Sequence, residues 1–240
     1  MCGRFTIRSI DRLRARFNPR DWEEVLRQPL LRPRYNIAPG QEVLTVVEAR
    51  NERSFELMNW GLIPSWSSEA AGFINARAET LEEKPSFSES FKRRRCLILA
   101  DGFYEWRRNG KSKQPYYFQM KDESPFAFAG LWDQWLNPGR ESESFKRNSA
   151  ITSCSIITTA PNQLLAAIHD RMPVILPPED YDTWLREDAR PDELKALLAP
   201  YPADEMKSFP VSQQVNHAQV DNPQLVEPVE VKDIEQGLLF

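Results

Sequence analysis

The sequence predicts an α+β fold with a largely antiparallel, barrel-like β core and peripheral helices. Segments with strand character are short, and turns or prolines separate them; the chain contains 19 prolines. Helical patterns are also short, so the elements are expected to pack as small helices around a sheet. A chain of 240 residues can bury a sizeable core, and we expect one domain over residues 1–240.

Six short segments are expected to be helical. Ser9 can cap the first, which places Leu13 and Phe17 on one apolar face. Pro29 stops the second, and Pro161 can open a later helix at its first turn. The expected helices cover residues 9–17, 21–28, 80–93, 161–168, 178–187 and 191–198.

The strands are expected to be short and joined by tight turns. Asn109-Gly110 is a strong hairpin signal, and the apolar run Cys96–Ala100 is typical of a buried strand. Pro64 cannot sit in a central strand, so the chain should leave the sheet after Trp60. Residues 34–40 are expected to form a loop over the core. The expected strands cover residues 43–47, 55–60, 96–100, 103–106, 115–120, 126–135, 155–159 and 206–211.

Composition excludes several classes of protein. Arginines interrupt every apolar run near the N-terminus, and no stretch approaches the roughly 20 apolar residues of a membrane span. We therefore expect a cytoplasmic protein that makes no contact with a membrane. Three cysteines lack metal-ligand spacing and only two histidines exist, so we expect no disulfide framework, no metal site and no cofactor.

Charge is distributed unevenly along the chain. The net charge is −4, but residues 1–50 carry ten arginines and six acids, whereas residues 171–240 carry six basic and fourteen acidic groups. Arginine can grip a phosphate with two hydrogen bonds, which suits a phosphate-bearing substrate. A solvated helix face explains most of these arginines equally well. Arg4 differs because it lies close to Cys2.

The N-terminus carries the most specific chemistry. Met1 precedes a small residue, so we expect its removal, which exposes Cys2 with both a free α-amine and a thiol. The α-amine has a pKa near 7.7–8 and is a better nucleophile at neutral pH than a lysine. Such an aminothiol can condense with an aldehyde to an imine and close to a five-membered thiazolidine. The alternative is that cysteine at position 2 has no role.

Four further side chains can each be interpreted as structural or as functional. Period-two alternation places Asn75 with its polar neighbours on one face of an extended segment, either solvated or facing a site. Glu105 lies among large aromatic residues, where burial would raise its pKa and suit proton transfer, unless it faces water on an edge strand. His169 sits at a helix end and is either structural or catalytic. Trp66 is either a core plug or a stacking platform for a base.

Six motifs together resemble the SRAP family (SOS response-associated peptidase), also called abasic site processing proteins. They occur in the family's order and span residues 2–173, and the bacterial single-domain members are most alike. The region 174–240, expected to add helices and closing strands, is less diagnostic. The motifs are Cys2-Gly3-Arg4-Phe5, residues 34–39, residues 60–64, residues 75–79, residues 100–106 and His169-Asp170-Arg171-Met172-Pro173.

The resemblance implies a covalent trap for abasic sites in single-stranded DNA. Cys2 would form the thiazolidine with the ring-opened deoxyribose aldehyde, and Asn75 would position the sugar and the amine. Glu105 would shuttle protons, and His169 would assist ring opening and the reverse reaction. The DNA-contacting residues implied are Arg4, Asn36, Pro39, Trp66, Arg77, Trp106 and Thr158.

The same resemblance implies a monomer that is cytoplasmic and associates with the nucleoid when bound to DNA. A lyase side reaction and autoproteolytic release of residues before Cys2 are also implied. Two other classes stay open: an N-terminal nucleophile amidohydrolase of the glutaminase kind, and a non-covalent single-strand binder. Neither the loop at 136–149 nor the acidic tail is expected to touch the chemistry.

Overall fold

The computed structural model describes residues 2–17, 32–49, 52–110, 112–136 and 150–231. The helix expected over residues 21–28 lies outside these ranges, as does nearly all of the loop expected over residues 136–149.

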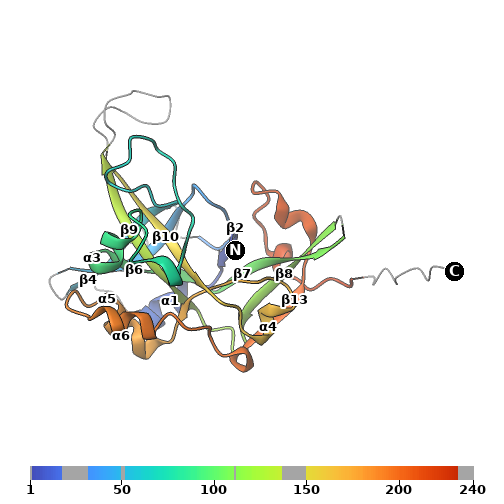
Figure 1. Ribbon diagram of the computed structural model, residues 1–240. Helices are drawn as coiled ribbons and strands as arrows, with labels where there is room; N and C mark the ends of the chain where they lie inside the picture. Colours follow the sequence, from blue (N-terminus) through green and yellow to red (C-terminus); the bar gives the residue numbers. More distant parts are fainter. Residues whose placement is uncertain (1, 18–31, 50–51, 111, 137–149, 232–240) are drawn as a thin grey trace.

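Five strands close into a barrel, on the left in Figure 1. Four of the five pairings around the barrel are antiparallel, and β4 pairs with β10 in parallel. All six residues of β6 are buried, as its continuous apolar run predicts. In order around the barrel the strands are β3 (Glu42–Ala49), β4 (Glu52–Trp60), β10 (Ala150–Thr159), β9 (Phe126–Leu136) and β6 (Arg95–Ala100).

A second, five-stranded antiparallel sheet lies beside the barrel. Its Phe5 packs against Trp60 of the barrel with ring centroids 5.1 Å apart, and its Phe103 lies 6.0 Å from Phe128. The main core therefore fills the space between barrel and sheet. In order the strands are β13 (Met206–Pro210), β8 (Ser112–Met120), β7 (Gly102–Asn109), β1 (Phe5–Ile7) and β2 (Arg34–Ile37).

Strand β1 places the N-terminus inside this second sheet. Phe5 pairs with Phe103 of β7, and the Tyr104 N–H donates to the Arg4 carbonyl oxygen at 3.0 Å. The two strands are antiparallel, so continuing their register past Arg4 brings Cys2 alongside the part of β7 that carries Glu105.

The remaining elements are short and lie around the two sheets (Figure 1). The indole N–H of Trp184, on α5, donates to the Cys96 carbonyl oxygen of β6 at 3.0 Å, which ties a peripheral helix to the barrel. The α-helices are α1 (Ile10–Phe17), α3 (Ser88–Arg93), α4 (Gln163–Ala166), α5 (Tyr181–Leu185) and α6 (Pro191–Ala196). The other short elements are β5 (Asn75–Arg77), β11 (Met172–Pro173), β12 (Ile175–Leu176), η1 (Ala78–Thr80), η2 (Pro178–Asp180), η3 (Ala203–Glu205), η4 (Gln213–Asn216) and η5 (Pro223–Val226).

Three local expectations were wrong. Arg34–Ile37 forms β2 rather than a loop, because its backbone pairs with β1. The helix expected over residues 80–93 is an α-helix only at Ser88–Arg93, since Pro85 disfavours helical geometry in the residue before it. The extended segment expected around Asn75 ends at Arg77, and a 3-10 helix begins at Ala78.

The expected fold class is confirmed. Short antiparallel strands form a barrel-like core, and short helices lie at its periphery.

Candidate active site

Four of the residues singled out from the sequence come together beside the N-terminus. The Asn75 side-chain amide donates to the Cys2 carbonyl oxygen at 3.0 Å. The charge of Glu105 acts on the Cys2 thiol, and the charge of His169 acts on Glu105. The four side chains come from the N-terminus, β5, β7 and the segment after α4, so only the tertiary fold unites them.

The Cys2 side chain is completely buried. Burial raises the pKa of the Cys2 thiol far above its ordinary value; Glu105 raises it further, while the positive charge of the amino terminus lowers it. The sulfur faces the Arg4 carbonyl oxygen at 3.8 Å. Because only the thiolate attacks readily, the Cys2 sulfur needs a nearby group to accept its proton during reaction.

Glu105 can be that group. Its side chain is only 1% exposed, so the alternative of an edge-strand carboxylate facing water does not hold. Burial raises the pKa of Glu105 above its ordinary value of 4.5, and the positive charges of the amino terminus and His169 lower it in part. A carboxyl group with a raised pKa can both accept and return a proton near neutral pH.

The His169 ring is oriented by its own loop. Its Nδ1 accepts a hydrogen bond from the Arg171 backbone N–H at 3.0 Å and also lies 2.9 Å from Asp170 Oδ1. The first contact needs a bare Nδ1 and the second a protonated one, so they belong to different charge states. Asp170 is 89% exposed, where an ion pair contributes little. The contact with the Arg171 backbone N–H therefore fixes the orientation of the His169 ring.

Asn75 is fixed by the barrel. Strand β5 pairs in parallel with β10, with Asn75 opposite Ile156, and the Ile156 N–H donates to the Ile74 carbonyl oxygen at 3.1 Å. The Asn75 side chain therefore ties the main chain of Cys2 to strand β5. This hydrogen bond orients the Cys2 backbone, including its nitrogen.

Trp66 projects from the loop between β4 and β5. Its side chain is 66% exposed, so it is not a core plug. The Ser65 N–H donates to Asp133 Oδ2 at 2.8 Å, and the Trp135 indole N–H donates to the Ser67 carbonyl oxygen at 2.7 Å. An exposed indole on a loop anchored at both sides is available for stacking.

Three other expected DNA contacts are accessible from outside. Arg4 is half-buried, and its Nη1 donates to the Gly3 carbonyl oxygen at 3.0 Å. Arg77 is exposed at the end of β5. Pro39 lines a mostly apolar cavity of about 360 Å³, together with Ile74, the residue before Asn75.

Two expected contacts are instead engaged inside the protein. Asn36 is 2% exposed, and its amide donates to three carbonyl oxygens within residues 215–220 at 2.8–3.3 Å. Thr158 is fully buried, and its hydroxyl donates to the Ala76 carbonyl oxygen at 3.3 Å. Both side chains can influence bound DNA only through the elements they hold.

Replacing Asn36 by alanine is expected to lower stability rather than contact DNA differently. Three buried carbonyl oxygens lose a donor, so the free energy of unfolding should fall by about 1–3 kcal/mol. Urea unfolding of wild type and Asn36→Ala, alongside DNA titrations of the folded proteins, measures this. Unchanged stability together with lost DNA binding would contradict the assignment.

Arg171 is a further residue of the site. The sequence alone assigned it no role, although it belongs to the motif His169-Asp170-Arg171-Met172-Pro173. Its guanidinium makes a two-pronged ion pair with Glu79 at 2.6 and 2.9 Å, and it also donates to the Thr158 carbonyl oxygen. Since its backbone N–H donates to His169, Arg171 ties η1 and β10 to the loop that orients the imidazole.

The C-terminal region contacts two of the residues implied in DNA binding, Trp106 and Asn36; that it does not touch the chemistry stays a prediction. The Trp106 indole N–H donates to Asn216 Oδ1 at 2.7 Å, and the Asn36 N–H donates to Asp221 Oδ1 at 3.1 Å. Residues 211–228 therefore cover the second sheet beside β7 and β2. No local sequence pattern predicts these contacts, because the residues that make them are far apart along the chain.

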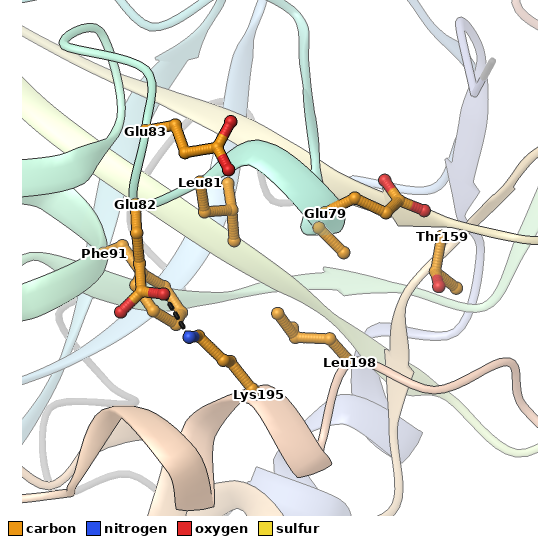
Figure 2. A pocket seen from close by; sticks show the side chains of 9 residues that line it. Glu79, Leu81, Glu82, Glu83, Phe91, Thr159, Lys195 and Leu198 are labelled. Atoms are coloured by element: carbon orange, nitrogen blue, oxygen red, sulfur yellow. Dashed lines mark ion pairs between the residues drawn. The ribbon is translucent and has the colours of Figure 1, made fainter.

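Two further cavities differ in their relation to the site. The one in Figure 2, of about 380 Å³, is lined by acidic and apolar side chains around Lys195, which pairs with Glu82. None of the four candidate residues lines it. Another, of about 420 Å³, is lined by His169 and Trp106, so it opens directly beside the candidate site.

In the described ranges, no three His, Cys, Asp or Glu side chains are grouped so as to hold a metal ion. Among the same residues, no helix has the length and apolar character to cross a membrane.

Comparisons with known proteins find relatives that match most of the chain. A family model described as SOS response associated peptidase (SRAP) matches residues 1–218. The abasic site processing protein YoqW of Bacillus subtilis (strain 168) is 42% identical over 233 residues, covering 95% of this chain and 99% of the relative. YedK of Escherichia coli (strain K12), also named an abasic site processing protein, is 32% identical over 198 residues, covering 82% and 85%.

The fold has a solved counterpart. A crystal structure of a protein from Bacteroides thetaiotaomicron superposes with a TM-score of 0.82 and 29% sequence identity, covering 95% of this chain and 100% of that one.

Proposed function

This chain belongs to the SOS response associated peptidase (SRAP) family, and from that premise we propose that it captures abasic sites in single-stranded DNA as a covalent adduct of Cys2. An abasic site carries a deoxyribose that opens to an aldehyde. Such a lesion has no base to read, so recognition must use the backbone and the aldehyde itself. Relatives named abasic site processing proteins support this substrate class.

The observation that carries the proposal is the way the first residues are held. Asn75 binds the Cys2 carbonyl oxygen at 3.0 Å, and the charge of the buried Glu105 raises the pKa of the Cys2 thiol. A cysteine inside a sheet needs no such arrangement for packing. An N-terminal aminothiol needs both an oriented amine and a proton acceptor.

The reaction balances with the loss of one water. After Met1 is removed, the Cys2 amine attacks the aldehyde carbon, and the carbinolamine loses water to form an imine. The Cys2 S–H then adds across the C=N bond: sulfur bonds to the carbon, and nitrogen gains the proton. The product is a thiazolidine that joins the protein to the sugar.

Each remaining side chain has one task. Glu105 takes a proton from the amine or thiol and returns it to the departing water or the ring nitrogen. Asn75 is a positioning residue for the amine. His169 protonates the sugar ring oxygen as the ring opens, and the Arg171 backbone N–H orients its ring.

The DNA path uses charge and stacking. Arg4 and Arg77 neutralise phosphates on either side of the lesion, and Trp66 stacks on a neighbouring base, with Pro39 supporting the strand. An overall charge of −4 is compatible with this, because binding needs only a local basic groove. We propose that the protein acts on DNA as a monomer.

Trp66→Ala is expected to weaken binding of intact single-stranded DNA by about 1–3 kcal/mol, the contribution of one stacked base. Fluorescence anisotropy at fixed salt measures the loss. An unchanged affinity would show that Trp66 is not a stacking platform.

The family's description as a peptidase favours a second activity of the same residues, release of a segment that precedes Cys2. A chain carrying three extra residues before Cys2 should lose them on incubation, and Glu105→Gln should slow the loss. A precursor that stays intact overturns this activity but leaves DNA capture standing.

The test of the main proposal uses two oligonucleotides. Purified protein is mixed with single-stranded DNA containing a natural abasic site, and in parallel with DNA containing a tetrahydrofuran analogue that cannot open to an aldehyde. A species that survives a denaturing gel is expected only with the natural site. Adducts with both oligonucleotides, or with neither, contradict the proposal. Release of ammonia from glutamine by the same preparation would favour the amidohydrolase alternative.

A further inference from the structure

A cationic surface borders the cavity beside His169. The cavity of about 420 Å³ is lined by Arg107 and Arg108 of β7 and by residues 167–170. Glu105 and these two arginines lie within four consecutive positions of one strand. The proposed proton shuttle and the two cations are therefore positioned by the same element.

Arg107, Arg108 and the neighbouring Lys113 of β8 have no carboxylate partner among the described residues. Within the described ranges, the ion pairs engage other basic side chains, among them Arg8, Arg94 and Arg171, and none engages Arg107, Arg108 or Lys113. All three are exposed. The cavity does contain one acid, Asp170, but its carboxylate faces His169 Nδ1 at 2.9 Å.

The register of the hairpin places like charges together. Arg108 lies directly opposite Lys113 in the β7–β8 pairing, and Arg107 lies opposite the neutral Gln114. Like charges facing each other across an antiparallel pair destabilise it. A solvent-exposed face has no need of a positively charged residue opposite another one. A bound polyanion would offset the repulsion between Arg108 and Lys113.

We propose that Arg107, Arg108 and Lys113 bind the phosphates of the DNA that flanks the captured nucleotide on the His169 side. The inference rests on the proposed function and extends it to a surface outside the family motifs. Arg108 lies three positions after Glu105 on β7, a span of roughly 10 Å. That reach extends beyond one nucleotide, so the contacts fall on neighbouring phosphates.

The hairpin is also free to meet a strand. In Figure 1 it projects away from the barrel, and the C-terminal segment lies beside it rather than over its tip. The remaining strand pairings of β7 and β8 are with β1 and β13. Bound DNA would run from Trp66 on the barrel side, past Cys2, to this hairpin.

The experiment is the salt dependence of non-covalent binding. The triple variant Arg107→Ala/Arg108→Ala/Lys113→Ala is titrated with intact single-stranded DNA between low and moderate salt. The slope of log K against log salt should become shallower by about 2, since each phosphate contact on a single strand contributes roughly 0.7. A slope equal to that of wild type overturns the inference.

Two controls keep the result specific. The variant Arg12→Ala/Lys121→Ala/Arg190→Ala removes three exposed cations from other surfaces and should leave the slope unchanged. The variant Arg107→Lys/Arg108→Lys keeps the charge and should retain most of the slope, which a structural role of the arginines would not predict. If the control triple variant loses as much slope as the hairpin variant, the effect is one of net charge and the inference fails.

Oligonucleotides shortened on one side of the abasic site test the location. The difference between wild type and hairpin variant should disappear when one flank is removed and persist when the other is removed. Persistence in both cases overturns the inference. Adduct formation by wild type is followed in the same samples: if no adduct forms, the proposed function fails, whereas an adduct with an unchanged slope rejects only the hairpin.

Discussion

Replacing Cys2 by alanine is expected to abolish the stable adduct with abasic DNA. Alanine still presents an α-amine after Met1 is removed, so an imine can form, but no sulfur is present to close the ring. The imine hydrolyses during denaturation, and the gel should show no shifted species. Reduction with borohydride before denaturation should restore a crosslink, because it converts the imine to a stable amine.

The matched control is Cys96→Ala, which removes another completely buried thiol, one on β6 in the barrel. It should form the adduct at the wild-type level if it folds, as circular dichroism will show. A Cys2→Ala protein that forms a stable adduct without borohydride would rule out the thiazolidine.

Changing Glu105 to glutamine is expected to slow adduct formation by about 100-fold, at the lower end of what general acid–base catalysis contributes. Glutamine keeps the size and hydrogen-bonding capacity of the side chain but cannot exchange a proton. Affinity for DNA containing a tetrahydrofuran site should stay within about twofold of wild type. Quench-flow or manual time courses give the rate, and anisotropy gives the affinity. Equal losses in both measurements would indicate a structural role.

The same variant is expected to be more stable than wild type at neutral pH. Burial raises the pKa of Glu105 in the folded state above its ordinary value of 4.5, so the folded protein binds this proton more tightly than the unfolded chain does. The stability that Glu105 contributes is present below pH 4.5 and is lost as pH rises through the raised pKa. Glutamine cannot ionise, so the Glu105→Gln variant does not lose this stability as pH rises.

Thermal unfolding across pH measures the effect. The Tm difference between Glu105→Gln and wild type should grow as pH rises from about 4 towards 7. A Tm difference that is constant with pH would show that burial does not raise the pKa of the Glu105 carboxyl group. A catalytic group that destabilises the fold is expected where function requires a buried charge.

Much of the fold follows from local sequence. The apolar run of β6 and the Asn109-Gly110 turn each determine their structure within a few residues, so both were predictable. Strand β2 was not, because its polar, turn-rich sequence becomes extended only by pairing with β1. The helix over residues 80–93 was overestimated because Pro85 limits it.

The candidate site also has one part that the sequence predicts and one part that it does not. The chemistry of Cys2, Glu105 and His169 is a property of their side chains, so the sequence could nominate them, and the motif resemblance joined them. The Asn75–Cys2 hydrogen bond joins residues 73 positions apart, and the hydrogen bonds of Asn36 to the C-terminal segment span up to 185 positions. Such contacts depend on how β1, β5 and the tail pack, which no local pattern encodes.

The most direct test of the account is the mass of the crosslinked N-terminal peptide. Protein and abasic oligonucleotide are reacted, digested with nuclease and protease, and analysed by tandem mass spectrometry without borohydride. The expected peptide begins at Cys2, lacks Met1, has gained the deoxyribose minus one water, and carries no alkylatable thiol at Cys2. A crosslinked peptide that retains Met1, or one in which the sugar is attached to a lysine, would contradict it.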